Sequence, residues 1–173
     1  KDYQPPKPNL EGIKIFNNYP LADLVEYIDW SPFFHAWELK GLYPKILKGR
    51  KYAIEANKLF KDAQNLLNRV INKKQLTAKA VIGIFPAHSK DEKVFINKTN
   101  FHFPRQLVDK GNKPNYSLSD YIAPKDDYIG MFALTTGYNI ELMIKEFEES
   151  NDDYNSIMIK VLADRLVEAF SEH

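Results

Sequence analysis

Cysteine is absent from the 173-residue sequence, which excludes disulfides, thiolate zinc sites and a cysteine nucleophile. Only seven glycines occur, and neither a Gly-x-Gly-x-x-Gly loop nor a phosphate-binding lysine motif is present, so the usual nucleotide-binding loops are excluded. No Gly-x-Ser-x-Gly elbow marks a serine nucleophile. No apolar run approaches about 18 residues, so we expect no membrane-spanning helix.

Neither sign of charge predominates in the sequence. Lysine and arginine total 24 and aspartate and glutamate total 23, which gives a net charge of +1. Proteins that bind nucleic acid usually carry a concentrated basic face, so we expect no nucleic-acid partner. The first residues of the sequence lack the apolar core of a secretion signal. Together with the absence of cysteine, this favours a cytoplasmic location.

The pattern of apolar residues predicts an α+β fold, with an antiparallel twisted sheet flanked by helices, and not a Rossmann-like parallel sheet. Residues 1–19 are rich in proline and asparagine and are expected to form an extended arm or linker, followed by one domain over residues 20–173. Helices are predicted over residues 20–28, 31–41, 52–73, 140–149 and 153–172, and strands over residues 80–85 and 93–97, paired as a hairpin, 101–103 and 128–135.

Local signals predict where several of these elements begin and end. Ser31 followed by Pro32 is typical of a helix N-cap and a first-turn proline. Gly41 is expected to end that helix, and Gly137 is expected to end the last strand. Asp152 is well placed to cap the last helix.

Asp29 is the first candidate for a ligand contact. It lies between Ile28 and Trp30 in the aromatic stretch Tyr-Ile-Asp-Trp-Ser-Pro-Phe-Phe. A carboxylate among large apolar side chains is costly to bury unless it is paired or hydrogen-bonded. Because it falls at the junction of two predicted helices, it either accepts a hydrogen bond from a ligand's ammonium or hydroxyl group, or caps the helix that follows.

Asp164 and Glu168 form the second candidate site. They are four residues apart, so they share one face of a helix, close to the apolar stripe that carries Ile157 and Val161. Lys160, one turn before Asp164, is placed to offset the repulsion between the two carboxylates. The pair either faces a cationic ligand or a partner domain, or forms the solvated edge of an amphipathic helix.

The four histidines do not show the spacing of metal ligands. No His-x-x-x-His pair occurs among His35, His88, His102 and His173, and no acid-rich cluster surrounds them. We therefore expect no metal site in this chain.

Five segments of the sequence, in the same order, resemble the reactivation domain of cobalamin-dependent methionine synthase. They span nearly the whole chain and lie at residues 27–34 continuing to 47, 81–87 (Val-Ile-Gly-Ile-Phe-Pro-Ala), 117–124 (Ser-Leu-Ser-Asp-Tyr-Ile-Ala-Pro), 127–130 (Asp-Tyr-Ile-Gly) and 152–170, which includes Ala-Asp-Arg-Leu-Val-Glu-Ala-Phe.

The resemblance implies a domain that binds S-adenosylmethionine for the reductive remethylation of oxidised cobalamin, within a methyltransferase that carries a methyl group from methyltetrahydrofolate to homocysteine. In that family the residue that matches Asp29 contacts S-adenosylmethionine, and the resemblance also covers Asp164 and Glu168. Trp30, Phe33 and Phe34 are expected to offer aromatic faces to the sulfonium. The implied partners are a separate cobalamin-binding domain or chain, which also carries the cobalt-ligating histidine, and a flavodoxin-type electron donor.

One segment of the resembled family does not occur in this sequence. An Arg-Pro-x-Pro-Gly-Tyr-Pro segment contributes an arginine and backbone groups to the family's ligand site, whereas this sequence ends at His173. An excised fragment, a split protein and a shortened homologue are all compatible with this difference. The alternative function is therefore a non-catalytic docking module that contacts a cobalamin-binding partner and holds no ligand. An unrelated α+β binding protein is a third possibility, against which the five collinear matches argue.

Overall fold

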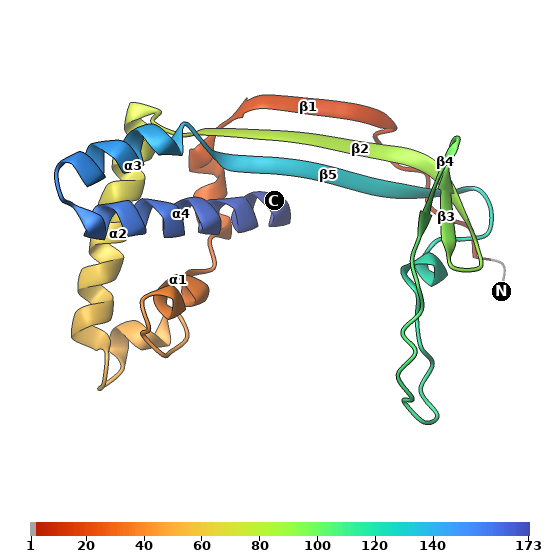
Figure 1. Ribbon diagram of the computed structural model, residues 1–173, viewed down its shortest axis with the longest axis horizontal. Coiled ribbons are helices and arrows are strands. Elements are labelled where there is room, and N and C mark those ends of the chain that lie inside the picture. The colour runs from red at the N-terminus through yellow and green to blue at the C-terminus, as the bar shows by residue number, and fades with distance from the viewer. Residues whose placement is uncertain (1–2) are drawn as a thin grey trace. The chain divides into compact units, whose positions relative to one another are not determined.

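The computed structural model describes residues 3–173, which form helices and strands in two compact units (Figure 1). The strands are β1 Gly12–Tyr19, β2 Thr77–Lys90, β3 Lys93–Ile96, β4 Thr99–His102 and β5 Asp127–Tyr138. The helices are η1 Leu21–Tyr27, α1 Trp30–Ala36, η2 Lys45–Lys48, α2 Ala53–Lys73, η3 Leu118–Tyr121, α3 Ile140–Glu149 and α4 Asp153–Glu172, of which the η elements are 3-10 helices.

The two units are built from interleaved parts of the chain. The first, here called the hairpin unit, comprises the residues up to 15 together with residues 81–133. The second, here called the helical unit, comprises residues 16–80 and 134–173. The chain passes from one unit to the other within β1, β2 and β5.

The strands form one open five-stranded sheet. Its order is β1-β2-β3-β4, and β5 also pairs with β2. β2 and β3 form the predicted antiparallel hairpin, with Lys90 opposite Lys93. β3 and β4 form a second antiparallel hairpin, with Ile96 opposite Thr99. Helices and an antiparallel sheet in one chain confirm the α+β prediction and exclude a doubly wound parallel sheet.

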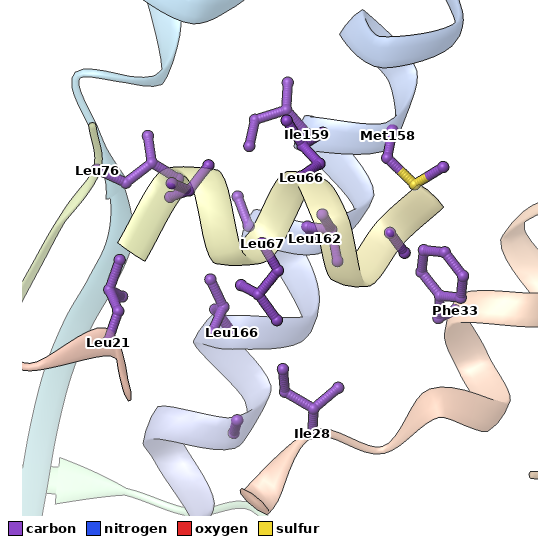
Figure 2. Close-up of a cluster of buried hydrophobic side chains, with 14 of the residues drawn as sticks. Leu21, Ile28, Phe33, Leu66, Leu67, Leu76, Met158, Ile159, Leu162 and Leu166 are labelled. Atoms are coloured by element: carbon purple, nitrogen blue, oxygen red, sulfur yellow. The ribbon is translucent and has the colours of Figure 1, made fainter. Parts of the chain in front are cut away.

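The core of the helical unit is built from buried side chains of η1, α1, α2, α3 and α4. Figure 2 shows Leu66 and Leu67 of α2 and Leu162 of α4 pointing into the space where the two helices cross. Leu162 and Leu166 are each only 1% exposed. Each buried leucine stabilises the unit by roughly 1.5–3 kcal/mol through the removal of apolar surface from water. The apolar spacing of α2 and α4 therefore explains both helices, and both were predicted to within one residue.

Helix α1 begins earlier and ends earlier than predicted. Its N-cap is Asp29, which has an extended backbone (φ −76°, ψ 111°) and accepts a hydrogen bond from the Ser31 amide, so the assignment of Ser31 as the N-cap was wrong. Pro32 is the third helical residue, where the amide that proline lacks would have no intrahelical acceptor. The helix ends at Ala36 and not near Gly41, because Glu38 turns the chain with φ 60°.

The strands extend beyond the predicted ranges. Residues 12–19 of the predicted arm form β1 and pair with β2, so this part of the arm is extended but belongs to the sheet. β2 continues in both directions beyond residues 80–85. Gly137 lies inside β5 and does not end it. The neighbouring Thr136 is fully buried, and its hydroxyl donates to the carbonyl of Ala163 at 2.9 Å, which ties β5 to α4.

The hairpin unit has a small apolar core and a polar network. Its buried apolar side chains include Val94 and Ile96. The Arg105 guanidinium donates to both carboxylate oxygens of Asp120, at 2.5 and 2.7 Å. Asp120 also accepts from the Ser117 amide at 2.9 Å, as part of a capping box at η3. This network joins the long loop after β4 to the helix that follows it.

Candidate functional site

Asp29 combines a structural bond with a free acceptor. Its Oδ1 accepts a hydrogen bond of 2.9 Å from the Ser31 amide, while the side chain is exposed between the buried residues Ile28 and Trp30. Within residues 3–173, Oδ2 has no hydrogen-bond partner or ion-pair partner. The capping role that the sequence left open is thus confirmed, and the second oxygen stays available to a ligand.

The turn that carries Asp29 is anchored by a hydrogen bond to Ser31 and by aromatic contacts with Phe60 of α2. The Ser31 hydroxyl accepts a hydrogen bond of 3.2 Å from the Tyr43 amide. The Tyr43 ring lies 5.4 Å from the ring of Phe60, and Trp30 packs edge-on against the same ring at 4.8 Å. These contacts attach the first turn of α1 to α2 through Phe60, so the position of the Asp29 carboxylate is fixed by the core of the helical unit.

The aromatic residues beside Asp29 are not open to a ligand. Phe33 and Phe34 are 0% exposed and Trp30 is 7% exposed. The Trp30 and Phe33 rings pack edge to face at 5.3 Å. The spacing of these residues, three and four positions apart, places them on one face of α1, and that face packs into the core. The prediction that these rings offer their faces to a sulfonium was therefore wrong.

Asp164 and Glu168 share one face of α4, as their spacing predicted, and both are exposed. The partner of Asp164 is Arg165, whose Nη2 lies 2.5 Å from Oδ2. Lys160 instead lies 3.9 Å from a carboxylate oxygen of Glu148, so the prediction that Lys160 offsets the charge of Asp164 was wrong. Arg165 forms an ion pair with Asp164. Within residues 3–173, Glu168 forms no ion pair, so its carboxylate is the one without a neutralising partner.

The structure brings the two candidate sites onto one unit without joining them directly. Ile28, next to Asp29, belongs to the same buried cluster as Leu162 and Leu166 of α4 (Figure 2). No hydrogen bond connects Asp29 with Asp164 or Glu168 within residues 3–173. The three acids are therefore surface groups over a shared core, and a ligand role for each stays a prediction.

Three of the four histidines contact aromatic or polar side chains. The His173 ring nitrogen Nε2 lies 2.5 Å from the Tyr19 hydroxyl, the His88 ring stacks on Phe95 at 5.1 Å, and His102 lies 3.3 Å from Glu92. Among residues 3–173, no group of three or more His, Cys, Asp or Glu side chains is arranged to hold a metal ion. Over the same residues, no helix has the length and apolar character needed to cross a membrane.

One hydrogen-bonded pair of the helical unit, Tyr154 and Asp62, was not predicted from the sequence. The Tyr154 hydroxyl of α4 donates to Asp62 Oδ2 of α2 at 3.0 Å. Burial of the phenol, followed by this hydrogen bond, raises the pKa of Tyr154 to about 12. Because the two residues are 92 positions apart, no local pattern could have joined them.

Comparisons with known proteins agree with the architecture. The family described as vitamin B12 dependent methionine synthase, activation domain, matches residues 20–173. Among solved structures, the crystal structure of the MetH reactivation domain bound to AdoHcy is similar, with a TM-score of 0.94 and 40% sequence identity over 98% of this chain and 56% of that chain. This chain thus spans about half the length of that relative.

Proposed function

Because the chain belongs to the activation-domain family of vitamin B12-dependent methionine synthase, we propose that it binds S-adenosylmethionine for the reductive remethylation of oxidised cobalamin. The relative of known structure is bound to AdoHcy, which shares the adenosyl and amino-acid parts of S-adenosylmethionine and lacks its transferable methyl group. The cobalamin would be held by a separate domain or chain. The chain would act as one part of a methyltransferase.

The observation that carries this proposal is the divided role of the Asp29 carboxylate. Oδ1 caps α1, and Oδ2 has no hydrogen-bond partner within residues 3–173. S-adenosylmethionine has an ammonium group and a sulfonium group, both cationic, so an exposed carboxylate with a free oxygen fits it. Charge-assisted hydrogen bonds are about twice as strong as neutral ones.

The side chains of this chain would have distinct roles at the site. S-adenosylmethionine supplies the methyl group when it is bound. Asp29 accepts a hydrogen bond from the ligand's ammonium, and the Ser31 amide keeps its carboxylate in place. Glu168 and Asp164 add negative charge on α4. The rings of Trp30 and Phe33 support α1 from the core and do not touch the ligand.

The remaining assignments are part of the same proposal. We take the partners to be the cobalamin-binding domain or chain and a flavodoxin-type electron donor, and the location to be the cytoplasm. The domain boundary at residue 20 stays a prediction; the pairing of β1 with β2 supports including residues 12–19 in the folded domain.

Isothermal titration with S-adenosylmethionine tests the proposal. We expect saturable binding that Asp29→Asn weakens about 10- to 100-fold, the effect of losing a hydrogen bond to a charged group. Asparagine is also a good N-cap, so α1 should persist, and the circular dichroism spectrum of this variant should match that of the wild type.

Asp152→Asn is the matched control. Asp152 also caps a helix, accepting from the Asn155 amide at 3.0 Å, but it caps α4 and is not one of the candidate ligand residues. Its replacement should leave the affinity for S-adenosylmethionine unchanged. The absence of saturable binding by the wild-type chain, or equal affinities for all three proteins, would contradict the proposal and favour the docking module.

A further inference from the structure

A row of basic side chains crosses the outward face of strands β2, β3 and β4. Lys90 lies opposite Lys93, and Lys93 lies opposite His102, so the three side chains project from neighbouring strands on one face of the sheet. Directly opposed residues have Cβ atoms about 4.5–5.5 Å apart, and like charges at such positions destabilise a sheet. Within residues 3–173, neither exposed lysine forms an ion pair. A bound anion would relieve the repulsion between them.

An aromatic stack lies beside this row on the same face. Phe95 comes two residues after Lys93 and lies opposite His88, and the two rings stack at 5.1 Å with an interplanar angle of 7°. The core of the hairpin unit lies on the other face, where Val94 and Ile96 are buried. The six outward positions of the three strands include no acid, and they hold His88, Lys90, Lys93, Phe95, Asn100 and His102.

A hollow of about 630 Å³ opens over this face. Its lining consists of Lys90, Asp91, Glu92, Lys93, Phe95, His102 and Arg105. The carboxylate of Glu92 is engaged, because it accepts from the Arg105 amide at 3.2 Å and lies 3.3 Å from His102. Asp91 is then the one lining acid without an ion pair within residues 3–173, against two unpaired lysines. The hollow therefore carries free positive charge, and its volume falls within the range of about 300–1,000 Å³ that is usual for small-molecule sites.

The unpaired cations are ammonium groups, which favours phosphate over carboxylate as the bound anion. The planar guanidinium of arginine matches a carboxylate, but Arg105 already donates to both carboxylate oxygens of Asp120, at 2.5 and 2.7 Å. A lysine ammonium is a compact point charge with three rotatable donors. Because Lys90 and Lys93 are directly opposed, their ammonium groups can donate to different oxygens of one tetrahedral phosphate.

We propose that this hollow binds a nucleoside monophosphate. The phosphate accepts hydrogen bonds from Lys90 and Lys93, and the base packs on the Phe95 ring, as bases stack on aromatic side chains elsewhere. His88 covers one side of this ring and does not line the hollow, so the base packs on another side. The site lies in the hairpin unit, whereas Asp29 lies in the helical unit. The proposal therefore does not depend on the binding of S-adenosylmethionine.

Titration of the whole chain with uridine 5′-monophosphate tests this proposal, because the probe has no adenosyl group in common with S-adenosylmethionine. The readout is the backbone amide resonances of Lys93 and Phe95 in a proton–nitrogen correlation spectrum, with the buried Leu162 of the helical unit as the internal reference. We expect saturable shifts of the first two resonances, with a dissociation constant of about 1 mM, and an unmoved Leu162 resonance.

Charge-removing variants test the role of the two lysines. Lys90→Gln and Lys93→Gln should each weaken binding about threefold, and the double variant about tenfold, which is the scale of exposed charge pairs. Lys98→Gln is the matched control, since Lys98 is an exposed lysine in the turn between β3 and β4 that does not line the hollow. Its affinity should equal that of the wild type, and the spectra of all variants should show the folded chain.

Matched probes separate the phosphate from the base. Uridine, which lacks the phosphate, should bind about tenfold more weakly, and ribose 5-phosphate, which lacks the base, about fivefold more weakly. Phe95→Leu should remove the second difference. Equal binding of either probe, an unchanged affinity of the double lysine variant, or unmoved Lys93 and Phe95 resonances would overturn the proposal. Binding of an oligouridylate of about ten nucleotides more than about a hundredfold tighter would overturn it in favour of single-stranded nucleic acid.

Discussion

The Ser31 amide donates a hydrogen bond of 2.9 Å to Asp29 Oδ1, two residues earlier in the chain. This short-range bond uses one oxygen of the carboxylate for the fold and leaves the other for the ligand contact that we propose. Oδ1 accepts from an amide at the start of α1 that has no intrahelical acceptor. Within residues 3–173, Oδ2 forms no hydrogen bond and no ion pair. The capping role and the proposed ligand contact can therefore be separated by the choice of substitution.

Replacement of the Asp29 side chain measures its capping role. Asp29→Ala removes the cap and should lower the free energy of unfolding by about 0.5–2 kcal/mol, whereas Asp29→Asn should lower it by a smaller amount. Urea denaturation of both variants, followed by circular dichroism, measures the difference. If the two substitutions cost the same, the bond to Ser31 does not stabilise α1.

A core substitution should destabilise the helical unit strongly. Leu162 is 1% exposed between α2 and α4, so Leu162→Ala should lower the free energy of unfolding by about 2–5 kcal/mol through lost burial and a new cavity. Leu142→Ala is the control, since Leu142 is 71% exposed, and its effect should stay within about 0.5 kcal/mol. Denaturant unfolding gives both values, and similar effects of the two substitutions would contradict the observed packing of α4.

The ion pair of Arg105 with Asp120 should make stability depend on pH. The hydrogen bonds from Arg105 and from the Ser117 amide lower the pKa of Asp120 from 3.8 to about 2. Because the folded-state pKa is the lower one, the stabilisation is present above pH 3.8 and is lost as the pH falls through about 2. Asp120→Asn should therefore be less stable than the wild type at neutral pH, and the difference should shrink on acidification.

Thermal unfolding midpoints of the two proteins between neutral pH and about pH 2 test this dependence on the Asp120 pKa. Asp126→Asn is the control, because Asp126 forms no hydrogen bond or ion pair within residues 3–173 and asparagine tolerates its positive φ. A difference between wild type and Asp120→Asn that is constant with pH would show that the carboxylate charge does not contribute.

The phenol of Tyr154 should titrate late. Burial and the hydrogen bond to Asp62 raise its pKa to about 12 from 10.0. The folded state favours the neutral phenol, so its stabilisation is present below pH 10 and is lost as the pH rises through about 12. Ultraviolet titration should show a late phase that Tyr154→Phe abolishes, with Tyr138→Phe, an exposed tyrosine, as the control. A late phase that survives Tyr154→Phe would contradict the assignment.

The long helices α2, α3 and α4 were predicted well because their signals are local. The apolar spacing over α2, α3 and α4 and the cap at Asp152 lie within each segment. The strands were less predictable, because their ends depend on neighbours in the sheet. Residues 12–19 contain Asn17 and Asn18, which disfavour strands, and pairing with β2 overrides that preference.

The candidate site was predicted in part. The position of Asp29 at a helix junction was visible in the sequence, and its exposure and cap agree with that position. The burial of the neighbouring aromatic residues could not be predicted from the sequence, because an aromatic face of a helix has the same spacing whether it covers a core or lines a ligand site. The pairing of Asp164 with Arg165, and not with Lys160, depends on side-chain rotamers that no spacing rule fixes.

The most direct measurement of the central claim is the side-chain carboxyl carbon resonance of Asp29 in the chain labelled at aspartate, during titration with S-adenosylmethionine. Asp29→Asn assigns the resonance by its disappearance. We expect a saturable shift of this resonance, with the Asp152 resonance unmoved. Binding of the ligand without any shift at Asp29 would show that another part of the surface holds it and would contradict the account.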